Sequence, residues 1–176
     1  MAAAVPGPQL AGLQERVGEL IGRLPGARPT EGATRHITIK FLGPTPAGRL
    51  PDVIGCCRDA AVGGDPCELR IQGLGAFPRA ARATVLWAGV TDPAGLLGRL
   101  ADGLDRAFTP MGYRAETRPF AAHVTLARFR QPARLELPDL EPLEPFVLKQ
   151  IGLYRSHLSP AGARYEPLAT FPLGRG

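Results

Sequence analysis

Residue types that often carry enzymatic chemistry are scarce in this chain of 176 residues. The two serines, Ser156 and Ser159, lie outside the G-x-S-x-G pattern that presents a serine nucleophile. The three cysteines, Cys56, Cys57 and Cys67, form no C-x-x-C pair. Their odd number and clustering argue against a disulfide framework and favour a reducing compartment. The sequence therefore supports neither a serine hydrolase nor a disulfide-stabilised scaffold.

Metal-ligand spacings, phosphate-binding glycine loops and long apolar runs are missing as well. The three histidines and three cysteines show no spacing typical of a zinc site, and neither a Walker A sequence nor a Rossmann fingerprint occurs. Residues 1–10 are broken by Pro6, Gly7 and Pro8, which argues against a signal peptide or a membrane span. We therefore expect no metal, no cofactor, no membrane association and a cytoplasmic location.

Lysine is nearly absent, because Lys40 and Lys149 are the only two in the chain. Arginine supplies the rest of the positive charge, and the net charge of +5 favours an anionic partner without identifying it. Hydrophobic residues make up 44% of the chain, an ordinary share for a globular protein. The 22 glycines and 19 prolines follow no fixed period, which predicts short elements within one domain over residues 1–176.

Apolar spacing predicts helices over residues 10–24, 49–62 and 93–108, the last with Asp92 as N-cap and Pro93 as its first residue. Strand-like runs, most of them bounded by glycine or proline, alternate with these helices. Short connections between the runs favour antiparallel pairing. The sequence therefore predicts an α+β fold, with strands over residues 35–42, 67–74, 83–90, 122–129, 146–154 and 164–171.

Two of the predicted strands share a local pattern, His36-Ile-Thr38-Ile and His123-Val-Thr125-Leu. Side chains alternate between the two faces of a strand, so each histidine projects on the same side as its threonine. We call His36, Thr38, His123 and Thr125 the HxT residues. One such segment reads as a packed histidine beside a β-forming threonine, but chance hardly explains two in a chain with three histidines.

Histidine and threonine in this arrangement suit phosphoester chemistry. Histidine has an unperturbed pKa of about 6.5, so two histidines can divide the work of base and acid near neutral pH. Threonine hydroxyls and an arginine guanidinium can hold phosphate oxygens and stabilise the charge that develops on them. The pair of motifs therefore supplies an acid, a base and oxygen contacts for such chemistry, and no metal ion is required.

The paired motifs resemble those of the 2H phosphoesterase superfamily, and the wider match is similar to its RNA 2′,3′-cyclic phosphodiesterase branch, historically called 2′-5′ RNA ligases. The resemblance rests on residues 36–43 and 118–128, and further on residues 75–79, 85–87 and 153–156. The chain departs from the family pattern in two places. Only residues 2–5 could form the first strand, and Ala122 stands where the family often has proline.

The resemblance implies a bilobal fold, in which two antiparallel β-sheets with outer helices surround a central cleft. Each sheet would supply one HxT strand, which gives a pseudo-twofold internal repeat. The implied activity is metal-independent hydrolysis of RNA 2′,3′-cyclic phosphodiester ends to 2′-phosphomonoesters. The implied partner is an RNA or oligonucleotide with such an end, and we expect the protein to be a monomer.

The resemblance also implies roles for individual residues. His36 would donate a proton to the leaving oxygen, and His123 would accept one from water. Thr38, Thr125 and Arg128 would contact the phosphate. Strict alternation along the second strand, however, sets Arg128 on the face opposite His123. Either the strand is irregular there or Arg128 has a structural role.

Two aromatic side chains, Phe41 and Tyr154, could stack on a base. Phe41 shares its predicted face with Ile37 and Ile39, which favours packing in the core, whereas Tyr154 suits either role equally. His157 lies in a turn-like stretch without a following threonine, so we expect it to be exposed to solvent.

Four arginines form a candidate basic rim for RNA, although a solvated surface explains each of them singly. They are Arg79, Arg82, Arg118 and Arg130.

Three alternative functions remain open at this point. A 2H enzyme could act on another cyclic or 2′-5′-linked nucleotide. The chain could join RNA ends by 2′-5′ ligation, or bind RNA or nucleotides in the same cleft without turnover. Analysis of the reaction product separates these alternatives.

Overall fold

The computed structural model describes residues 1–30, 35–159 and 162–174. It contains three α-helices, which are α1 (Gly7–Arg23), α2 (Leu50–Val62) and α3 (Leu96–Phe108) among these residues. Short 3-10 turns cover Ala47–Arg49, Ala80–Arg82 and Thr109–Met111. The strands are β1 (Ala2–Ala4), β2 (Ala27–Pro29), β3 (His36–Thr38), β4 (Cys67–Phe77), β5 (Ala83–Thr91), β6 (His123–Ala133), β7 (Phe146–Leu148), β8 (Gln150–Ser159) and β9 (Gly162–Pro172).

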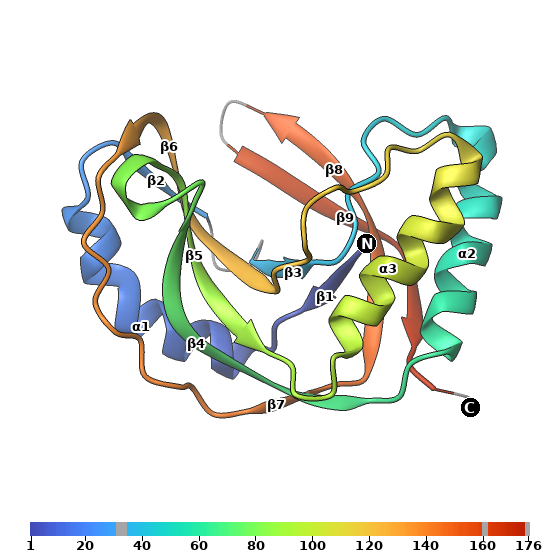
Figure 1. The fold of residues 1–176 in the computed structure, drawn as a ribbon, viewed down its shortest axis with the longest axis horizontal. Helices are drawn as coiled ribbons and strands as arrows, with labels where there is room; N and C mark the ends of the chain where they lie inside the picture. The colour runs from blue at the N-terminus through green and yellow to red at the C-terminus, as the bar shows by residue number, and fades with distance from the viewer. Residues whose placement is uncertain (31–34, 160–161, 175–176) are drawn as a thin grey trace.

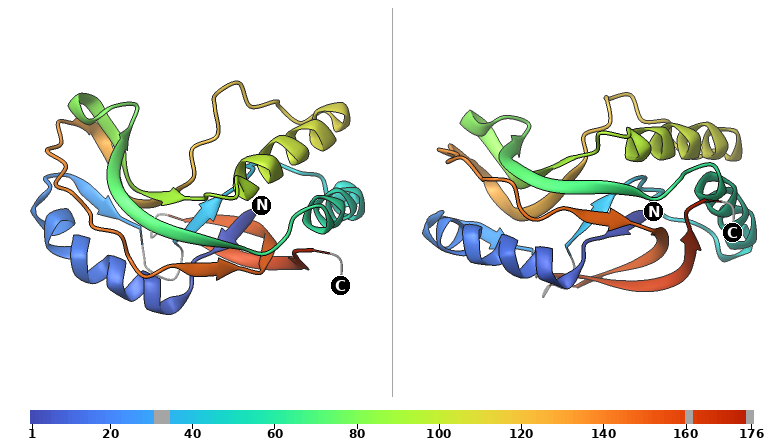
Figure 2. Two further views of the ribbon diagram at one scale, coloured as in Figure 1. Left: turned by 60° about the horizontal axis from the view of Figure 1, so that its bottom comes forward. Right: turned by 90° about the horizontal axis from the view of Figure 1, so that it is seen from below.

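The strands form one antiparallel sheet in the order β7-β4-β5-β6-β3-β1-β8-β9, and β2 pairs with the distal part of β6. The sheet curls strongly, and α1 lies at one end of the molecule while α2 and α3 lie together at the other (Figure 1). Two further views show the same bend in the long strand β4 (Figure 2). The predicted α+β class and antiparallel pairing are confirmed.

The expectation of two separate sheets in a bilobal repeat is not met. Strands β3 and β6 pair through Ile37 and Val124, and this contact joins the two HxT strands within one continuous sheet. The physical reason is that each strand satisfies hydrogen-bonding groups at the other's edge, where two separate sheets would each leave an exposed edge. The HxT motifs are therefore neighbours in the sheet.

Helix boundaries follow local signals with small shifts. Helix α1 begins earlier than predicted because Pro8 is well tolerated in a first turn, and it buries Leu13, Val17 and Ile21 at helical spacing. Helix α3 begins at Leu96, so Pro93 is not its first residue. The prediction of Asp92 as N-cap is wrong, because Gly95 occupies that position, although the Asp92 carboxylate accepts a hydrogen bond from the backbone N–H of Leu97 at 2.6 Å.

Strand lengths differ more from the predictions. The first HxT strand is only three residues long, whereas β4 and β6 run several residues further than expected. The predicted strand 146–154 is divided into β7 and β8. Residues 2–4 do form a strand, and β2 is an element that the sequence did not predict.

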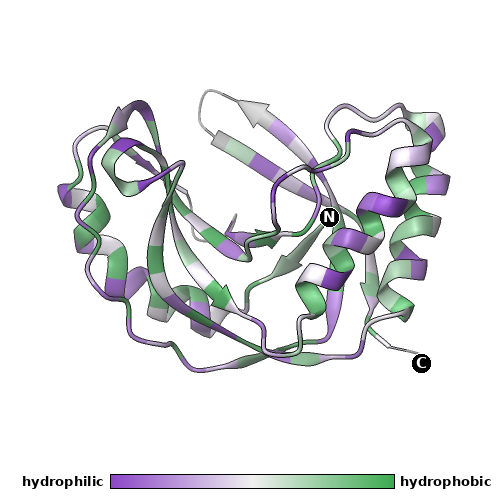
Figure 3. Ribbon diagram, in the orientation of Figure 1, coloured by the Kyte–Doolittle hydropathy of each residue, from purple (hydrophilic) through white to green (hydrophobic). Residues whose placement is uncertain are grey.

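The core lies against the sheet face opposite the HxT side chains. Fully buried side chains on this face include Ile37, Leu86 and Leu126. Apolar residues recur at helical spacing among the polar ones, so each helix presents one apolar side (Figure 3). This packing anchors the HxT strands from behind. No helix in residues 1–30, 35–159 and 162–174 is long and apolar enough to cross a membrane.

Candidate active site

The HxT residues lie together on one face of the sheet. Ile37 pairs directly with Val124, and both side chains are fully buried on the core face. Since β3 and β6 are antiparallel, this register sets His36 opposite Thr125 and Thr38 opposite His123. The two histidines are then diagonal neighbours, with Cα atoms about 7–8 Å apart. The four side chains therefore form one group on this face of the sheet.

The His123 ring is oriented by a hydrogen bond to the backbone just before strand β6. Its Nδ1 lies 2.7 Å from the carbonyl oxygen of Ala121. A carbonyl oxygen only accepts, so Nδ1 carries the proton and donates it. In the neutral ring Nε2 then holds a free lone pair. His123 is therefore set up to take a proton at Nε2.

Aromatic rings pack against His123 and hold its plane. Phe77 meets the imidazole edge to face at 5.1 Å between ring centroids, and Trp87 lies 5.9 Å away. Phe77 and Trp87 also contact each other, at 5.2 Å. The indole lies flat over Gly75, which has no Cβ to block it. From the sequence, residues 75–79 and 85–87 contribute only to the family resemblance, and neither Phe77 nor Trp87 is predicted as a site residue.

We expect Gly75→Ala to disturb this packing, because a Cβ at residue 75 would fall within the Trp87 ring. Moving the indole costs about 1–3 kcal/mol of unfolding free energy by the usual overpacking effect. It also loosens His123, so kcat falls along with stability. Thermal unfolding and steady-state kinetics check this, with Gly98→Ala as control because a Cβ there meets nothing within 4 Å. Equal stability of the two variants would contradict the prediction.

Two of the described side chains contact the His36 ring. Its Nε2 lies 3.0 Å from the hydroxyl oxygen of Thr38, within the same motif. The Tyr165 ring meets the imidazole edge to face at 4.7 Å and stays 38% exposed. Tyr165 lies in β9, far from His36 in the sequence, so only the fold reveals this contact. Sequence reasoning missed Tyr165, which carries no motif of its own.

Arg128 lies on the same face as His123, because β6 is bulged. Leu86 pairs with Ala127 and Trp87 pairs with Thr125, so Leu126 is the extra residue on β6. Leu126 and Ala127 are both buried, and alternation resumes with Arg128 exposed. From the sequence, either the strand is irregular before Arg128 or Arg128 has a structural role, and in the structure the strand is irregular. Whether Arg128 touches phosphate stays a prediction.

The favoured core position of Phe41 is wrong, because its side chain is 77% exposed. Strand β3 ends at Thr38, so the alternation that would turn Phe41 inward stops before it. Tyr154 is half-buried and its ring lies over Gly152. Gly152 pairs with Ala2, which pairs in turn with Thr38, so Tyr154 lies on the HxT face.

His157 is exposed as predicted, but it lies in strand β8 rather than in a turn. Its Nε2 is 2.8 Å from a carboxylate oxygen of Glu166, which also lies 3.6 Å from Arg155. The hydrogen bond from His157 and the charge of Arg155 lower the pKa of Glu166 from its usual value. Arg118 pairs with Glu116 at 3.6 Å on the surface. Neither His157 nor Arg118 joins the HxT residues.

A buried ammonium group links the segments that follow β3 and precede β6. Lys40 Nζ forms an ion pair with Asp105 and donates to the carbonyl oxygen of Arg114 at 2.9 Å. Asp105 also accepts from the backbone N–H of Glu116 at 3.1 Å. The hydrogen bond from Lys40 holds the pKa of Asp105 below its usual value. The sequence signal for this link is Lys40, a charged residue within an apolar run.

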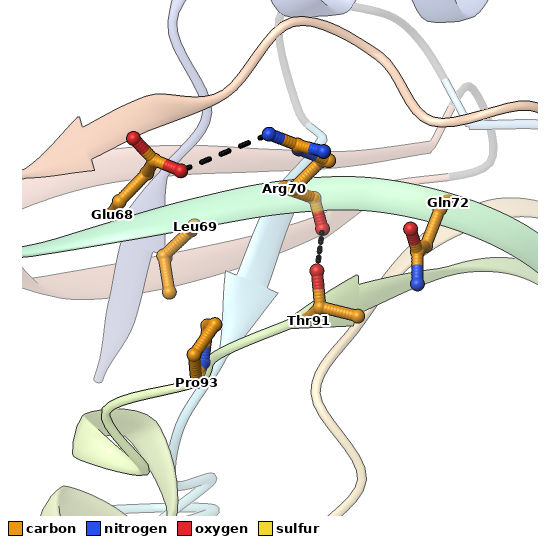
Figure 4. A pocket seen from close by; sticks show the side chains of 6 residues that line it. All are labelled: Glu68, Leu69, Arg70, Gln72, Thr91 and Pro93. Atoms are coloured by element: carbon orange, nitrogen blue, oxygen red, sulfur yellow. Dashed lines mark hydrogen bonds and ion pairs between the residues drawn. The ribbon is translucent and has the colours of Figure 1, made fainter.

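One cavity of about 220 Å³ continues the HxT face toward the start of β4 (Figure 4). Gly89 pairs with both His123 and Gln72, so the Gln72 side chain projects on the same face as the histidine. A second cavity, of about 250 Å³, lies between the segment after β3 and the segment before β6, with Arg49 and Arg114 in its lining. Within the described residues, no group of three histidine, cysteine or acidic side chains could hold a metal ion.

Known proteins resemble this chain over most of its length. A protein of Methanothermobacter thermautotrophicus named RNA 2′,3′-cyclic phosphodiesterase is 31% identical over 173 residues, covering 92% of this chain and 93% of the relative. A Thermus thermophilus protein of the same name is 33% identical over 154 residues, covering 84% and 76%. A crystal structure of a protein from Thermus thermophilus covers 99% of this chain and 97% of its own, with a TM-score of 0.83 at 29% identity.

A family model agrees with these relatives. The model described as the 2′-5′ RNA ligase superfamily matches residues 11–160, which include both HxT motifs and the whole of the two strands that carry them. The resemblance to 2H phosphoesterases drawn from the sequence is confirmed. The chain belongs to the 2′-5′ RNA ligase superfamily.

Proposed function

We propose that this protein hydrolyses the 2′,3′-cyclic phosphodiester at the end of an RNA strand to a 2′-phosphomonoester, without a metal ion. The observation that carries the proposal is the pairing of β3 with β6, which brings two half-buried histidines and two half-buried threonines onto one face of the sheet. The names of the relatives, at 31% and 33% identity, support the same substrate. The 2′-phosphate product and the catalytic roles described below are part of the proposal and are not contained in those names.

His123 acts as the base in the proposed reaction. Its Nε2 lone pair takes a proton from water, and the resulting hydroxide attacks phosphorus. Support for this direction comes from Nδ1, which donates to the Ala121 carbonyl and leaves Nε2 as the accepting atom. A base that already holds its orientation loses little entropy when the substrate binds.

His36 acts as the acid. As the bond between phosphorus and the 3′ oxygen breaks, His36 gives its proton to that oxygen, so the product carries a free 3′ hydroxyl and a 2′-phosphate. The two histidines then exchange their protons with water before the next turnover. Thr38, Thr125 and Arg128 bind the non-bridging phosphate oxygens and stabilise the negative charge of the transition state.

Phe41 and Tyr154 are the proposed base contacts. Phe41 is exposed beside the first motif, and Tyr154 lies on the HxT face next to Gly152. A nucleobase stacks on such rings without sequence preference, because every base has an aromatic face. We treat residues 1–176 as one 2H unit and the protein as a monomer.

The test is to incubate an RNA with a 2′,3′-cyclic phosphate end with the protein in EDTA and to identify the terminal phosphate. We expect a 2′-phosphate, formed at the same rate with and without EDTA. Loss of turnover in EDTA would contradict the metal-free mechanism, and a 3′-phosphate would contradict the role of the 3′ oxygen as leaving group. Binding without turnover would favour a binding module, and a 2′-5′ linkage between added RNA ends would favour a ligase.

A further inference from the structure

Two arginines of the sheet lie directly opposite each other. Arg28 of β2 pairs with Arg128 of β6, and both side chains are exposed on the same face. Like charges at directly opposed positions destabilise a sheet. Among the ion pairs of the described residues, none involves either arginine. Within the described part of the chain, this pair of positive charges beside the HxT residues is not neutralised, and an anion there would relieve the repulsion.

The positive charge continues along β6 beyond this pair. Arg130 lies two residues past Arg128 and is exposed on the same face. The turn between β4 and β5 carries Arg79 and Arg82, both exposed. A hydrogen bond of 2.9 Å from the Leu135 N–H to the Ala80 carbonyl holds the distal segment of the chain after β6 against this turn. We call Arg28, Arg79, Arg82 and Arg130 the arginine ridge.

The opposite end of the HxT face carries balanced charge. There the guanidinium of Arg70 lies 3.8 Å from the carboxylate of Glu68, as Figure 4 shows, and the pair lines the cavity beside Thr91. Asp92 follows immediately in the chain. A polyanion that leaves the HxT residues in this direction meets the Glu68 carboxylate, whereas the charged side chains of β6 beyond Thr125 are all arginines.

We propose that the arginine ridge binds the phosphates of the nucleotides that precede the terminal cyclic phosphate, so that the protein acts on an RNA strand in preference to a single nucleotide. This inference rests on the proposed function, because it starts from a phosphate held at the HxT residues. The five residue steps from Thr125 to Arg130 span at most about 17 Å of strand. An extended RNA end of a few nucleotides covers that distance and reaches the ridge.

A comparison of two substrates tests the ridge. One is a mononucleotide 2′,3′-cyclic phosphate, and the other is a ten-nucleotide RNA with the same terminal group. We expect the double variant Arg28→Gln/Arg130→Gln to raise KM for the RNA at least tenfold, with kcat unchanged and mononucleotide kinetics within twofold of wild type. The matched control is Arg58→Gln/Arg106→Gln, which removes the same charge from exposed positions on α2 and α3.

Two results would overturn the proposal. Equal losses on the RNA and the mononucleotide would assign Arg28 and Arg130 to the terminal phosphate or to folding, and circular dichroism melting separates those two causes. A KM for RNA that matches the control would mean that the strand leaves the site in another direction.

Binding measurements keep the ridge separate from the proposed hydrolysis. Fluorescence anisotropy with a ten-nucleotide RNA that ends in a 3′ hydroxyl requires no turnover. The logarithm of the binding constant falls with the logarithm of salt concentration, and losing two phosphate contacts reduces that slope by about 1.4. If the double variant Arg28→Gln/Arg130→Gln has the same slope as wild type, the arginine ridge does not bind RNA, even if hydrolysis is seen. Failure of wild type to hydrolyse, with the slope reduced as expected, sinks the proposed function alone.

Discussion

Replacing His123 with asparagine is expected to lower kcat for cyclic phosphate hydrolysis by about 10²- to 10⁴-fold, the usual contribution of a general base. The asparagine amide can still donate to the Ala121 carbonyl, as Nδ1 does in the wild type. The packing against Phe77 and Trp87 is only trimmed, so the protein should fold. What disappears is the Nε2 lone pair, and the loss therefore falls on kcat far more than on KM.

His36→Ala is expected to reduce kcat by a similar factor, because it removes the proton that the leaving oxygen needs. The double variant should lose much less than the product of the two single losses, since the two histidines act as a unit. A bell-shaped pH profile in the wild type should lose its acidic limb in His123→Asn and its basic limb in His36→Ala. The assignment of base and acid would be reversed if the limbs were lost the other way round.

The control for both variants is His157→Ala. His157 is exposed in β8, and among the described residues its ring pairs with Glu166 on that surface, so kcat should stay within twofold of wild type. Melting by circular dichroism should show all three variants folded. A tenfold loss in the control, or full activity in both site variants, would mean that the reaction takes place elsewhere on the molecule.

The face on which each HxT side chain lies could be predicted from the sequence, because alternation along a strand is a local property. The neighbouring position of the two strands could not. It depends on the pairing of Ile37 with Val124 across a long sequence separation, and two sheets with one motif each are equally consistent with the local pattern. Pairing partners are decided by the whole fold.

Arg128 and Phe41 show where local reasoning fails. The bulge at Leu126 arises from the register against Leu86 and Trp87, and no residue of β6 announces it by itself. For Phe41 the error lies in the length of β3, which ends at Thr38 while the apolar pattern continues. Alternation predicts a face only as far as the strand extends.

The aromatic neighbours of the histidines illustrate a different limit. Phe77, Trp87 and Tyr165 reach His123 and His36 from strands far away in the sequence. A single aromatic residue in a strand is ordinarily a packing residue, so its place beside a histidine has no local signature. The reason for a glycine at residue 75 is visible only in the structure, where the Trp87 indole occupies the space that a Cβ would need.

Asp105→Ala is expected to destabilise the protein by about 2–3 kcal/mol, because it leaves the buried Lys40 ammonium without its counter-ion. The carbonyl of Arg114 still accepts from Lys40, and Asp105 is partly open to solvent, so the loss stays below that of a fully buried pair. A change of this size lowers Tm by roughly 5–10 °C in a chain of this length. Asp102→Ala, an exposed change on the same helix, is the control.

The effect of Asp105→Ala should depend on pH with a definite sign. Lys40 lowers the pKa of Asp105 in the folded protein, so the folded state favours the charged carboxylate more than the unfolded chain does. The stabilisation is therefore complete above the ordinary aspartate pKa of about 4 and is lost as the pH falls through the lower folded value. Urea unfolding from pH 7 to pH 3 should show the wild type and Asp105→Ala converging at the acidic end. A gap that is constant with pH would mean that Asp105 stabilises the protein by packing rather than by charge. Lys40 follows the first motif, and its partners Asp105 and Arg114 precede the second motif in the chain. If the stabilities of the two proteins converge at acidic pH and Asp105→Ala also loses kcat, the ion pair is the link that holds both histidine strands in register.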